Sequence, residues 1–249
     1  MIKNKKIVVV MPAYNAAKTL ETTYREIPLD IVDEVLLVDD ASTDETSKIA
    51  ASLNIKLIVH AKNLGYGGNQ KTCYTEALKT GADIIIMLHP DYQYTPKLIG
   101  AMSYLLESGE FDIVLGSRIL GGKATNGGMP QYKYIFNRIL TLFQNILMRA
   151  KLSEYHTGYR AYTKEVLQTI HWQKNSDDFV FDNQFLSQAI FANFRIGEIT
   201  CPTRYFKEAS SINFSRSVKY GIGCLHTAVI FRLHKMGLYK SKLFASPKQ

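Results

Sequence analysis

The chain has 249 residues, of which 46% are hydrophobic and 21% are charged, a composition that excludes an intrinsically disordered protein. Its three cysteines are far apart and form no C-x-x-C pair, so neither a disulfide framework nor a zinc site is supported, and a reducing, cytoplasmic setting is expected. The formal net charge of +8 favours anionic partners, but the basic residues are dispersed and carry no nucleic-acid-binding motif, so no nucleic-acid partner is expected.

Membrane insertion is not expected from the hydropathy pattern. No uninterrupted apolar run approaches the ~20 residues that span a bilayer, and the apolar run that ends at Pro12 is too short for a signal peptide. We therefore expect a cytoplasmic protein that is soluble or attached peripherally to the inner face of the membrane.

Short apolar runs alternate with helical stretches over about the first 120 residues, a pattern that predicts βαβ units and a mostly parallel sheet. The sequence Ser42–Glu45 matches the S-x-x-E capping box and predicts a helix start. The glycine-rich run Gly65–Gly68 precedes a helix expected from Asn69 to Thr80; its glycines either admit a phosphate or only form a tight turn. The expected strands are Ile7–Met11, Val35–Val38, Leu57–Val59, Ile84–Leu88 and Ile113–Leu115.

The second half begins with a loop expected over Gly121–Pro130. Apolar residues then recur at helical spacing over Tyr134–Ala150 and predict an amphipathic helix, which faces either the core or a membrane. A helix is expected over Phe181–Phe194 and a strand over Arg195–Thr200. The basic and apolar Ser217–Leu238 fits an interfacial helix or an oligomer contact.

One carboxylate, Asp91, follows the apolar run Ile84–Met87. Ligands of open α/β sheets bind beyond the carboxyl ends of the strands, where Asp91 would hold a metal-bound phosphate. Taken alone, Asp91 has a second interpretation as a turn or helix-capping residue, because it follows a proline.

Polar segments follow each of the first four expected strands: Met11–Asn15, Val38–Asp44, Asn63–Gly67 and the segment around Asp91. In order and spacing they resemble family-two glycosyltransferases, close to the branch of dolichyl-phosphate mannose synthase and polyprenyl-phosphate glycosyltransferases. The resemblance implies a Rossmann-like GT-A fold, which is an α/β fold with a mostly parallel central sheet flanked by helices, followed by C-terminal amphipathic helices. It implies a catalytic domain over 1–205, with a nucleotide-sugar-binding half (1–120) and an acceptor-side half (121–205), and an extension over 206–249.

The resemblance also implies a set of donor-binding residues. Tyr14 would stack on the base, Asp39 would accept a hydrogen bond from a base N–H, and Asp40 would orient its loop or only support the turn. Asn15 stands where the family often has Glu, and Gln93 would help to place the donor. The implied nucleotide-sugar-binding residues are Pro12, Ala13, Tyr14, Asn15, Asp39, Asp40, Asn63, Gly67, Gln93 and Arg204.

Asp91 would be the metal-binding member of the family's D-x-D motif, which holds Mg²⁺ or Mn²⁺ against the two phosphates. His89 replaces the first aspartate of that motif. This replacement would reduce the metal affinity, shift the metal preference toward Mn²⁺, or leave Asp91, phosphates and water to hold the ion; His89 itself is a candidate metal ligand. The replacement also keeps open an alternative function, a nucleotide-sugar-binding protein with weak or no turnover.

Catalytic and acceptor-side residues are implied in the same way. Arg118 would lie near the phosphates or the acceptor, where its fork of donors suits phosphate. Asp182 is either a general base for a hydroxyl acceptor or a structural partner, and a phosphate acceptor would need no base. Arg160 would contact phosphate or brace its loop, and Arg204 with Ala209–Ile212 would belong to a loop that closes over the donor diphosphate.

The predicted activity is that of an inverting, metal-assisted glycosyltransferase of the hexosyltransferase type, acting in cell-envelope polysaccharide or glycolipid biosynthesis. The donor would be a UDP- or GDP-sugar, and the acceptor a polyprenyl phosphate or a saccharide, free or lipid-linked. The two amphipathic stretches favour a membrane-associated acceptor, and a homo-oligomer is compatible with them.

Overall fold

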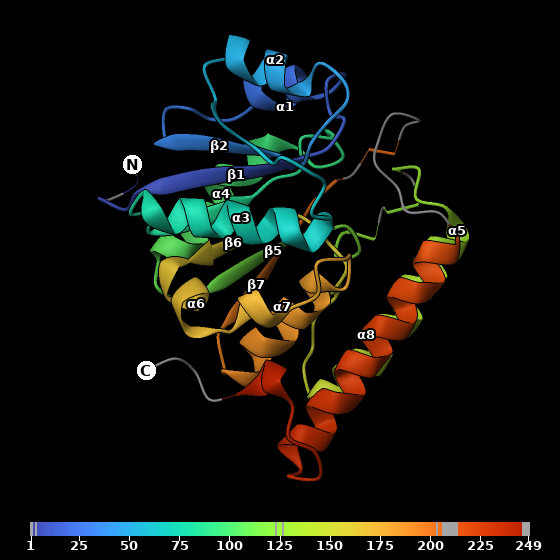
Figure 1. The fold of residues 1–249 in the computed structure, drawn as a ribbon. Helices are drawn as coiled ribbons and strands as arrows, with labels where there is room; N and C mark the ends of the chain where they lie inside the picture. The colour runs from blue at the N-terminus through green and yellow to red at the C-terminus, as the bar shows by residue number, and fades with distance from the viewer. Residues whose placement is uncertain are drawn as a thin grey trace.

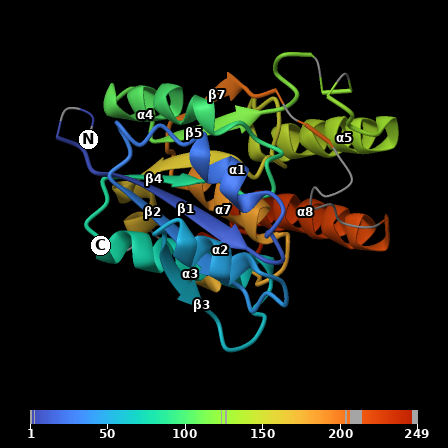
Figure 2. The ribbon, with the colours of Figure 1, turned by 90° about the horizontal axis from the view of Figure 1, so that it is seen from above.

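A seven-stranded sheet forms the centre of the computed structural model, which describes residues 2, 4–122, 124–125, 127–202, 204–205 and 214–245. The strand order is β3-β2-β1-β4-β6-β5-β7, and within this sheet only β6 runs antiparallel to its neighbours (Figures 1 and 2). The predicted α/β fold with a mostly parallel sheet is confirmed. The strands are β1 (Ile7–Ala13), β2 (Glu34–Asp39), β3 (Lys56–Val59), β4 (Ile84–Met87), β5 (Ile113–Ser117), β6 (Arg160–Thr163) and β7 (Ile196–Thr200).

Helices cover both faces of the sheet and bury a separate apolar core against each. Side chains from α3, α6, α7 and α8 fill one core, and side chains from α1, α2 and α4 fill the other. Central strands are therefore apolar on both sides, which explains the continuous runs that predicted them. The helices are α1 (Leu20–Arg25), α2 (Thr46–Ser52), α3 (Tyr66–Lys79), α4 (Ile99–Glu107), α5 (Gln131–Met148), α6 (Lys164–Thr169), α7 (Phe181–Phe191) and α8 (Phe214–Lys235).

The predicted capping box at Ser42–Glu45 was wrong. Helix α2 begins only at Thr46, and no side chain caps it. The Ser42 hydroxyl instead accepts a hydrogen bond from the backbone N–H of Asn15, at 2.8 Å, and so joins the loops that follow β1 and β2. Because of this tertiary contact, the Ser42 hydroxyl does not cap the helix as the local motif predicts.

Helix α3 begins at Tyr66, three residues earlier than predicted, and its glycines serve close packing. The backbone N–H of Gly67 donates to the carbonyl oxygen of Asp177 at 2.7 Å. A Cβ at Gly67 would collide with the Ser176 carbonyl and lie 2.8 Å from the Cβ of Phe181. The backbone N–H of Gly67 is thus already bound within the protein, and the predicted contact of Gly67 with the donor stays a prediction.

Helices α5 and α8 lie side by side and extend away from the body of the sheet (Figures 1 and 2). They confirm the helices predicted over 134–150 and 217–238, with α5 starting three residues earlier and α8 ending three residues earlier. Within the described residues, no helix combines the length and the apolar character needed to cross a bilayer. The predicted closing loop 209–212 lies outside the described residues.

Candidate active site

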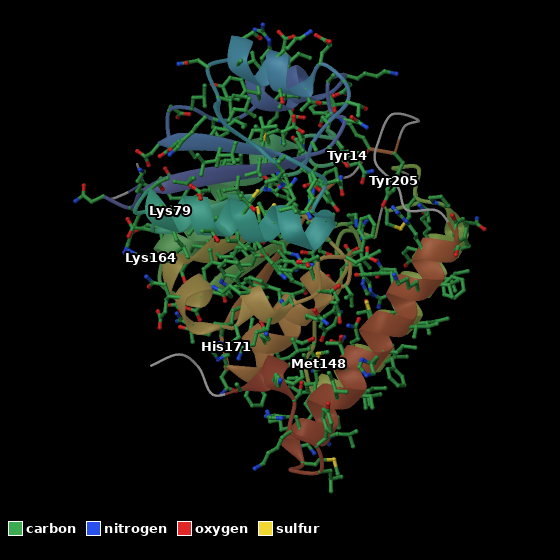
Figure 3. All side chains as sticks on the ribbon, in the orientation of Figure 1. Tyr14, Lys79, Met148, Lys164, His171 and Tyr205 are labelled. Atoms are coloured by element: carbon green, nitrogen blue, oxygen red, sulfur yellow. The ribbon has the colours of Figure 1, made fainter. Side chains whose placement is uncertain are left out.

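The predicted donor-binding segments gather at one edge of the sheet, where the parallel strands end. Figure 3 shows Tyr14 and Tyr205 near this edge, and Lys79 and Lys164 at the opposite one. Tyr14 directly follows β1 and is 55% exposed, so its ring is open to a planar ligand. Parallel topology alone brings these segments together.

The residues on either side of Tyr14 in the sequence are fixed by hydrogen bonds within the protein. Pro12 and Ala13 belong to β1 and pair with Val38 and Asp39 of β2. Asn15 adopts a positive φ of 51°, and its side-chain oxygen accepts a hydrogen bond from the backbone N–H of Thr43 at 2.9 Å. Asn15 therefore shapes the turn behind Tyr14.

Asp39 is 1% exposed, and each of its carboxylate oxygens has a partner inside the protein. One oxygen accepts a hydrogen bond from the N–H of Ser42 at 2.9 Å, and the other accepts the Ser47 hydroxyl. A base N–H would have to share an oxygen with one of these donors.

Asp40 holds the loop that follows β3, and its predicted role in donor binding stays a prediction. Its carboxylate accepts the backbone N–H groups of Leu64, at 2.8 Å, and Gly65, at 3.0 Å. It also contacts the Nδ1 of His60 at 2.7 Å. Asn63 donates its side-chain amide to the Asp40 carbonyl at 3.1 Å, so both residues are bound within the loop.

A cavity of about 420 Å³ opens beside β4, between the sheet edge and helices α5 and α8. One end is polar and includes four residues that the sequence had singled out as catalytic or metal-binding: His89, Asp91, Arg118 and Asp182. Gln93 lines it as well. The remaining wall is largely apolar and comes mainly from the two helices; it includes Phe136, Leu140, Val218, Ile222 and Leu225, together with Met129, which precedes α5.

His89 and Asp91 are the candidate metal-binding pair. Asp91 accepts a hydrogen bond from the backbone N–H of Gln93 at 3.1 Å, and burial raises the pKa of its carboxyl despite the nearby His89. Burial lowers the pKa of His89, which keeps the ring neutral at physiological pH. A carboxylate and a neutral imidazole are chemically suited to Mn²⁺ or Mg²⁺ with diphosphate oxygens completing the coordination. Within the described part of the chain, no group of three or more His, Cys, Asp or Glu side chains is placed to hold an ion by itself.

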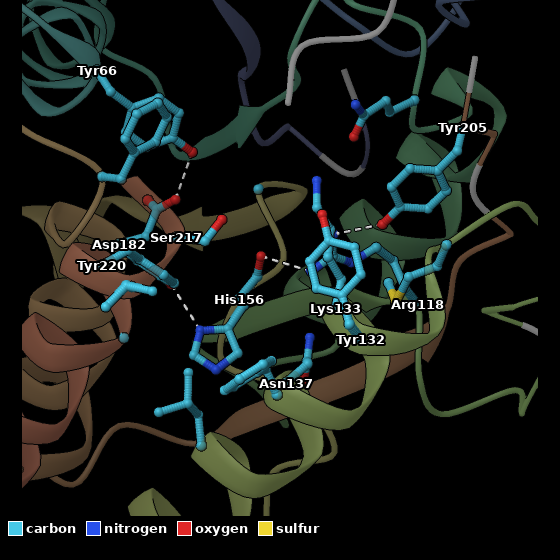
Figure 4. Close-up of a pocket in the computed structure, with 18 of the residues that line it drawn as sticks. Tyr66, Arg118, Tyr132, Lys133, Asn137, His156, Asp182, Tyr205, Ser217 and Tyr220 are labelled. Carbon is cyan, nitrogen blue, oxygen red and sulfur yellow. Dashed lines mark hydrogen bonds between the residues drawn. The ribbon is translucent and has the colours of Figure 1, made fainter. Parts of the chain in front are cut away.

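Asp182 is bound by several donors at the polar end of the cavity. It accepts the Tyr66 hydroxyl at 2.6 Å (Figure 4). It also accepts the Gln70 amide at 3.1 Å, and the Arg160 guanidinium lies 3.6 Å away. Burial and the charge of Asp182 raise the pKa of Tyr66 well above its usual value, so the phenol keeps its proton. A carboxylate with these partners is a weak candidate for a general base, and the structural alternative fits its contacts better.

Arg160 starts β6 and is completely buried. Its guanidinium donates to three backbone carbonyls, those of Tyr155, Thr157 and Asp182, at 2.7–3.0 Å. Arg160 therefore braces the segment before β6 and holds it against α7, which is the bracing alternative predicted for it.

Arg118 forms a buried ion pair with Glu154, a residue that the sequence analysis missed. The Glu154 carboxylate accepts from the backbone N–H of Arg118 at 2.9 Å and from its Nε at 2.8 Å. The remaining guanidinium nitrogens donate to the Tyr205 hydroxyl, at 3.0 Å, and to the His156 carbonyl, at 2.9 Å (Figure 4). The pair lowers the pKa of Glu154 and raises that of Arg118, so both stay charged beside the cavity.

Two further residues line the cavity, and the sequence analysis singled out neither as a site residue. Lys133, in the first turn of α5, is a cation of the cavity, and burial together with the charge of Arg118 lowers its pKa. His156 accepts or donates a hydrogen bond with the Tyr220 hydroxyl of α8 at 2.7 Å. Lys133 belongs to no local motif, so only the packing of α5 against the sheet reveals it.

Arg204 lies next to the polar end but does not line the cavity. Its backbone N–H donates to the Gln93 carbonyl at 3.1 Å. Its exposed guanidinium lies over the Tyr92 ring, 4.9 Å from the ring centre. The predicted donor contact of Arg204 stays a prediction.

The strand order with a single antiparallel strand, β6, and a cavity beyond the strand ends fit a nucleotide-sugar transferase fold of the GT-A type. Residues 8–170 match the model of glycosyl transferase family 2, and the chain belongs to that family. It is therefore a glycosyltransferase that uses a nucleotide-sugar donor, and the resemblance found in its motifs is confirmed.

The relatives include two archaeal glycosyltransferases. UDP-N-acetylglucosamine–dolichyl-phosphate N-acetylglucosaminyltransferase of Methanococcus voltae is 27% identical over 219 residues, which cover 81% of this chain and 87% of that protein. A hexosyltransferase of low-salt glycan biosynthesis from Haloferax volcanii is 30% identical over 178 residues, which cover 69% of this chain and 41% of that protein.

Solved structures of glucosyl-3-phosphoglycerate synthase from Mycobacterium tuberculosis share the fold. The complex with UDP superimposes with a TM-score of 0.72 at 18% identity, covering 96% of this chain and 82% of that chain. The complex with Mn²⁺, UDP-glucose and phosphoglyceric acid has a TM-score of 0.70 at 19% identity, with the same coverage.

Proposed function

We propose that the protein transfers a sugar, with inversion, from a UDP- or GDP-sugar to a polyprenyl phosphate bound in the cavity between the sheet edge, α5 and α8. The observation that carries this proposal is the division of the cavity into a polar end and an apolar wall. A polyprenyl phosphate has the same division, with a charged head and a hydrocarbon chain. The named acceptor of the Methanococcus voltae relative, dolichyl phosphate, belongs to this class.

The state of Asp182 supports a phosphate acceptor. A hydroxyl acceptor needs a base to remove its proton, whereas a phosphate oxygen attacks the anomeric carbon without one. Asp182 is occupied by Tyr66, Gln70 and Arg160, and its contacts suit a structural role. Lys133 supplies a cation to the same cavity, where it would hold the acceptor phosphate.

The donor half of the proposed reaction follows the sheet edge. Tyr14 would stack on the base, and Asp91 with His89 would hold Mn²⁺ or Mg²⁺ against the diphosphate. When bound, the ion neutralises charge that develops on the leaving nucleoside diphosphate. Attack from the cavity side, opposite that leaving group, gives inversion at the anomeric carbon.

Gly221 of α8 offers a direct test of the apolar wall. A Cβ there would lie 3.7 Å from the Cδ1 of Leu140, which is ordinary contact, so alanine fits while leucine would fill the space between the helices. We expect Gly221→Leu to reduce kcat/KM for polyprenyl phosphate at least tenfold and to leave UDP or GDP binding unchanged. Gly221→Ala is the matched control and should keep most of the activity.

The assay supplies radiolabelled UDP- and GDP-sugars, dolichyl phosphate in detergent, and Mn²⁺, and measures label in the organic phase. Product NMR gives the anomeric configuration. Transfer to saccharides but not to dolichyl phosphate would refute the proposed acceptor, and retention of configuration would refute inversion. Donor binding without transfer to either acceptor class would instead support the alternative of a nucleotide-sugar-binding protein.

A further inference from the structure

The hydroxyl of Tyr66 lies between His89 and Asp182, and its single proton can be donated to only one of them. Its oxygen is 2.6 Å from the Oδ2 of Asp182 and 3.2 Å from the Nε2 of His89. The ionised carboxylate can only accept, so the hydroxyl donates to Asp182. The phenol oxygen must then accept from His89, which places the imidazole proton on Nε2.

The packing of His89 supports the same assignment of its two ring edges. A Cβ at Gly158 would lie 2.8 Å from both Cδ2 and Nε2 of His89, so this edge of the ring packs against the glycine and Tyr66. The Tyr66 and His89 rings are nearly parallel, at 8°, with their centres 5.4 Å apart. Nδ1 lies on the opposite edge, carries a lone pair in this tautomer, and has no hydrogen bond to any residue that the structure describes.

We propose that Tyr66 and Asp182 are positioning residues that fix His89 as a nitrogen ligand, through Nδ1, of the divalent ion held by Asp91 and the donor diphosphate. The inference rests on the donor half of the proposed function but not on the acceptor. A ligating histidine typically donates its second ring N–H to a partner that sets its tautomer and orientation. Here that partner is a phenol, which is itself oriented by a carboxylate.

The glycine-rich start of α3 is what places Tyr66 in this position. The close approach of Gly67 to Ser176 and Asp177 docks the first turn of the helix against the segment that leads into α7. Tyr66 lies in that first turn and Asp182 in the first turn of α7. The run Gly65–Gly68 therefore positions the Tyr66 hydroxyl beside His89, the proposed metal ligand.

An imidazole ligand alters metal preference as well as affinity. Nitrogen donors suit transition metals, whereas Mg²⁺ prefers oxygen ligands. We expect the protein with UDP or GDP to bind Mn²⁺ much more tightly than Mg²⁺, and His89→Asp to reduce that preference.

The decisive measurement is pulsed EPR of tag-free protein with Mn²⁺ and UDP or GDP. We expect electron spin-echo modulation from a directly coordinated ¹⁴N in the wild type, and none in His89→Asp. Tyr66→Phe should weaken Mn²⁺ affinity by about tenfold, in the range found for outer-shell partners of metal ligands. Tyr220→Phe is the matched control, because it removes a phenol of the same cavity that contacts His156 rather than His89.

Three outcomes would overturn the proposal: Mn²⁺ bound without ¹⁴N modulation in the wild type, unchanged Mn²⁺ affinity in Tyr66→Phe, or no Mn²⁺ binding with either nucleotide. The acceptor is absent from these samples, so its identity does not affect the result. A nitrogen-coordinated Mn²⁺ in a protein that fails to glycosylate dolichyl phosphate would refute the proposed acceptor and leave the proposed ligand intact.

Discussion

The ion pair between Arg118 and Glu154 is buried beside the cavity, and its stability depends on both partners. Replacing Glu154 by glutamine leaves the guanidinium buried without a counter-charge. We expect Glu154→Gln to lower the free energy of unfolding by about 3 kcal/mol, as is usual when one partner of a buried pair is removed. Urea unfolding measures this change.

The exposed pair of Glu45 and Lys48 provides the matched control, because both side chains are more than 60% exposed. Glu45→Gln should cost less than about 1 kcal/mol. Equal effects of the two substitutions would show that the Arg118–Glu154 pair contributes no more than a surface contact.

The pKa of His156 makes the stability of the protein depend on pH. Burial lowers this pKa to about 4, whereas a histidine in an unfolded chain titrates near 6.5. Between these values the unfolded state binds a proton that the folded state does not, so the free energy of unfolding falls as the pH falls from about 6.5 to about 4. At pH 5 this loss from His156 amounts to about 2 kcal/mol.

Urea unfolding of the wild type and His156→Gln at pH 7.5 and pH 5 tests the effect. The wild type should lose more stability on acidification than the variant, because glutamine does not titrate. His226→Gln, at an exposed position of α8, should behave like the wild type. The same pH dependence in the wild type and His156→Gln would assign the acid lability to other groups.

The close contact between the start of α3 and the start of α7 can be tested by one substitution. Gly67→Ala would bring a Cβ into collision with the Ser176 carbonyl and to 2.8 Å from Phe181, so α3 must move away from α7. We expect a loss of about 2 kcal/mol of stability, measured by thermal or urea unfolding.

Gly100 in α4 is the control for this substitution. A Cβ there has its nearest neighbour, Ile31, at 3.4 Å, and alanine is the better helix former. Gly100→Ala should therefore leave stability unchanged or raise it slightly. A neutral Gly67→Ala would mean that the α3–α7 contact yields easily and that Tyr66 is not rigidly placed.

Elements could be predicted from sequence where burial alone determines the residue type. β1 is buried on both faces, so all its side chains are apolar and the run is visible. β6 was missed because its first residue is Arg160, whose charge is satisfied by backbone carbonyls and by Asp182, 22 residues away in sequence. The capping box at Ser42 failed for a related reason, since a distant backbone group binds its hydroxyl.

The same distinction separates the predicted site residues from the missed ones. His89, Asp91 and Arg118 follow strands, and strand ends converge whatever the side chains are. Lys133 lines the cavity, and Glu154 pairs with Arg118 beside it, only because α5 and the segment before β6 pack there. No spacing rule within the sequence encodes that contact.

The whole molecule presents an apolar surface on α5 and α8 in a chain with net charge +8. Single exposed apolar residues are common, but a contiguous set on two adjacent helices indicates an interaction surface. The set on α5 comprises Tyr132, Ile135, Phe136, Ile139, Leu142, Phe143 and Ile146. On α8, Val218, Ile222 and Val229 are exposed as well.

A membrane surface is the occupant that best fits an acceptor with a long hydrocarbon chain, and vesicle flotation tests it. Ile139 and Ile146 are seven residues apart on one helix face and are 58% and 65% exposed. Inserting one such side chain contributes about 1.5–3 kcal/mol, so Ile139→Glu with Ile146→Glu should reduce partition onto anionic vesicles at least tenfold. Leu29→Glu, at a 53% exposed position outside these helices, should not.

The salt dependence of vesicle binding distinguishes its electrostatic contribution from its apolar contribution. Electrostatic attraction of the basic chain to anionic lipid is screened within about 8 Å at physiological ionic strength, whereas apolar insertion persists in salt. Wild-type binding should therefore weaken but not vanish in 0.5 M NaCl, while the double variant should lose its residual binding. The alternative outcome is a wild type that does not float with vesicles but sediments as a dimer, and a double variant that sediments as a monomer. The apolar surface would then be an oligomer contact, because a second copy would cover the face that the membrane was expected to cover.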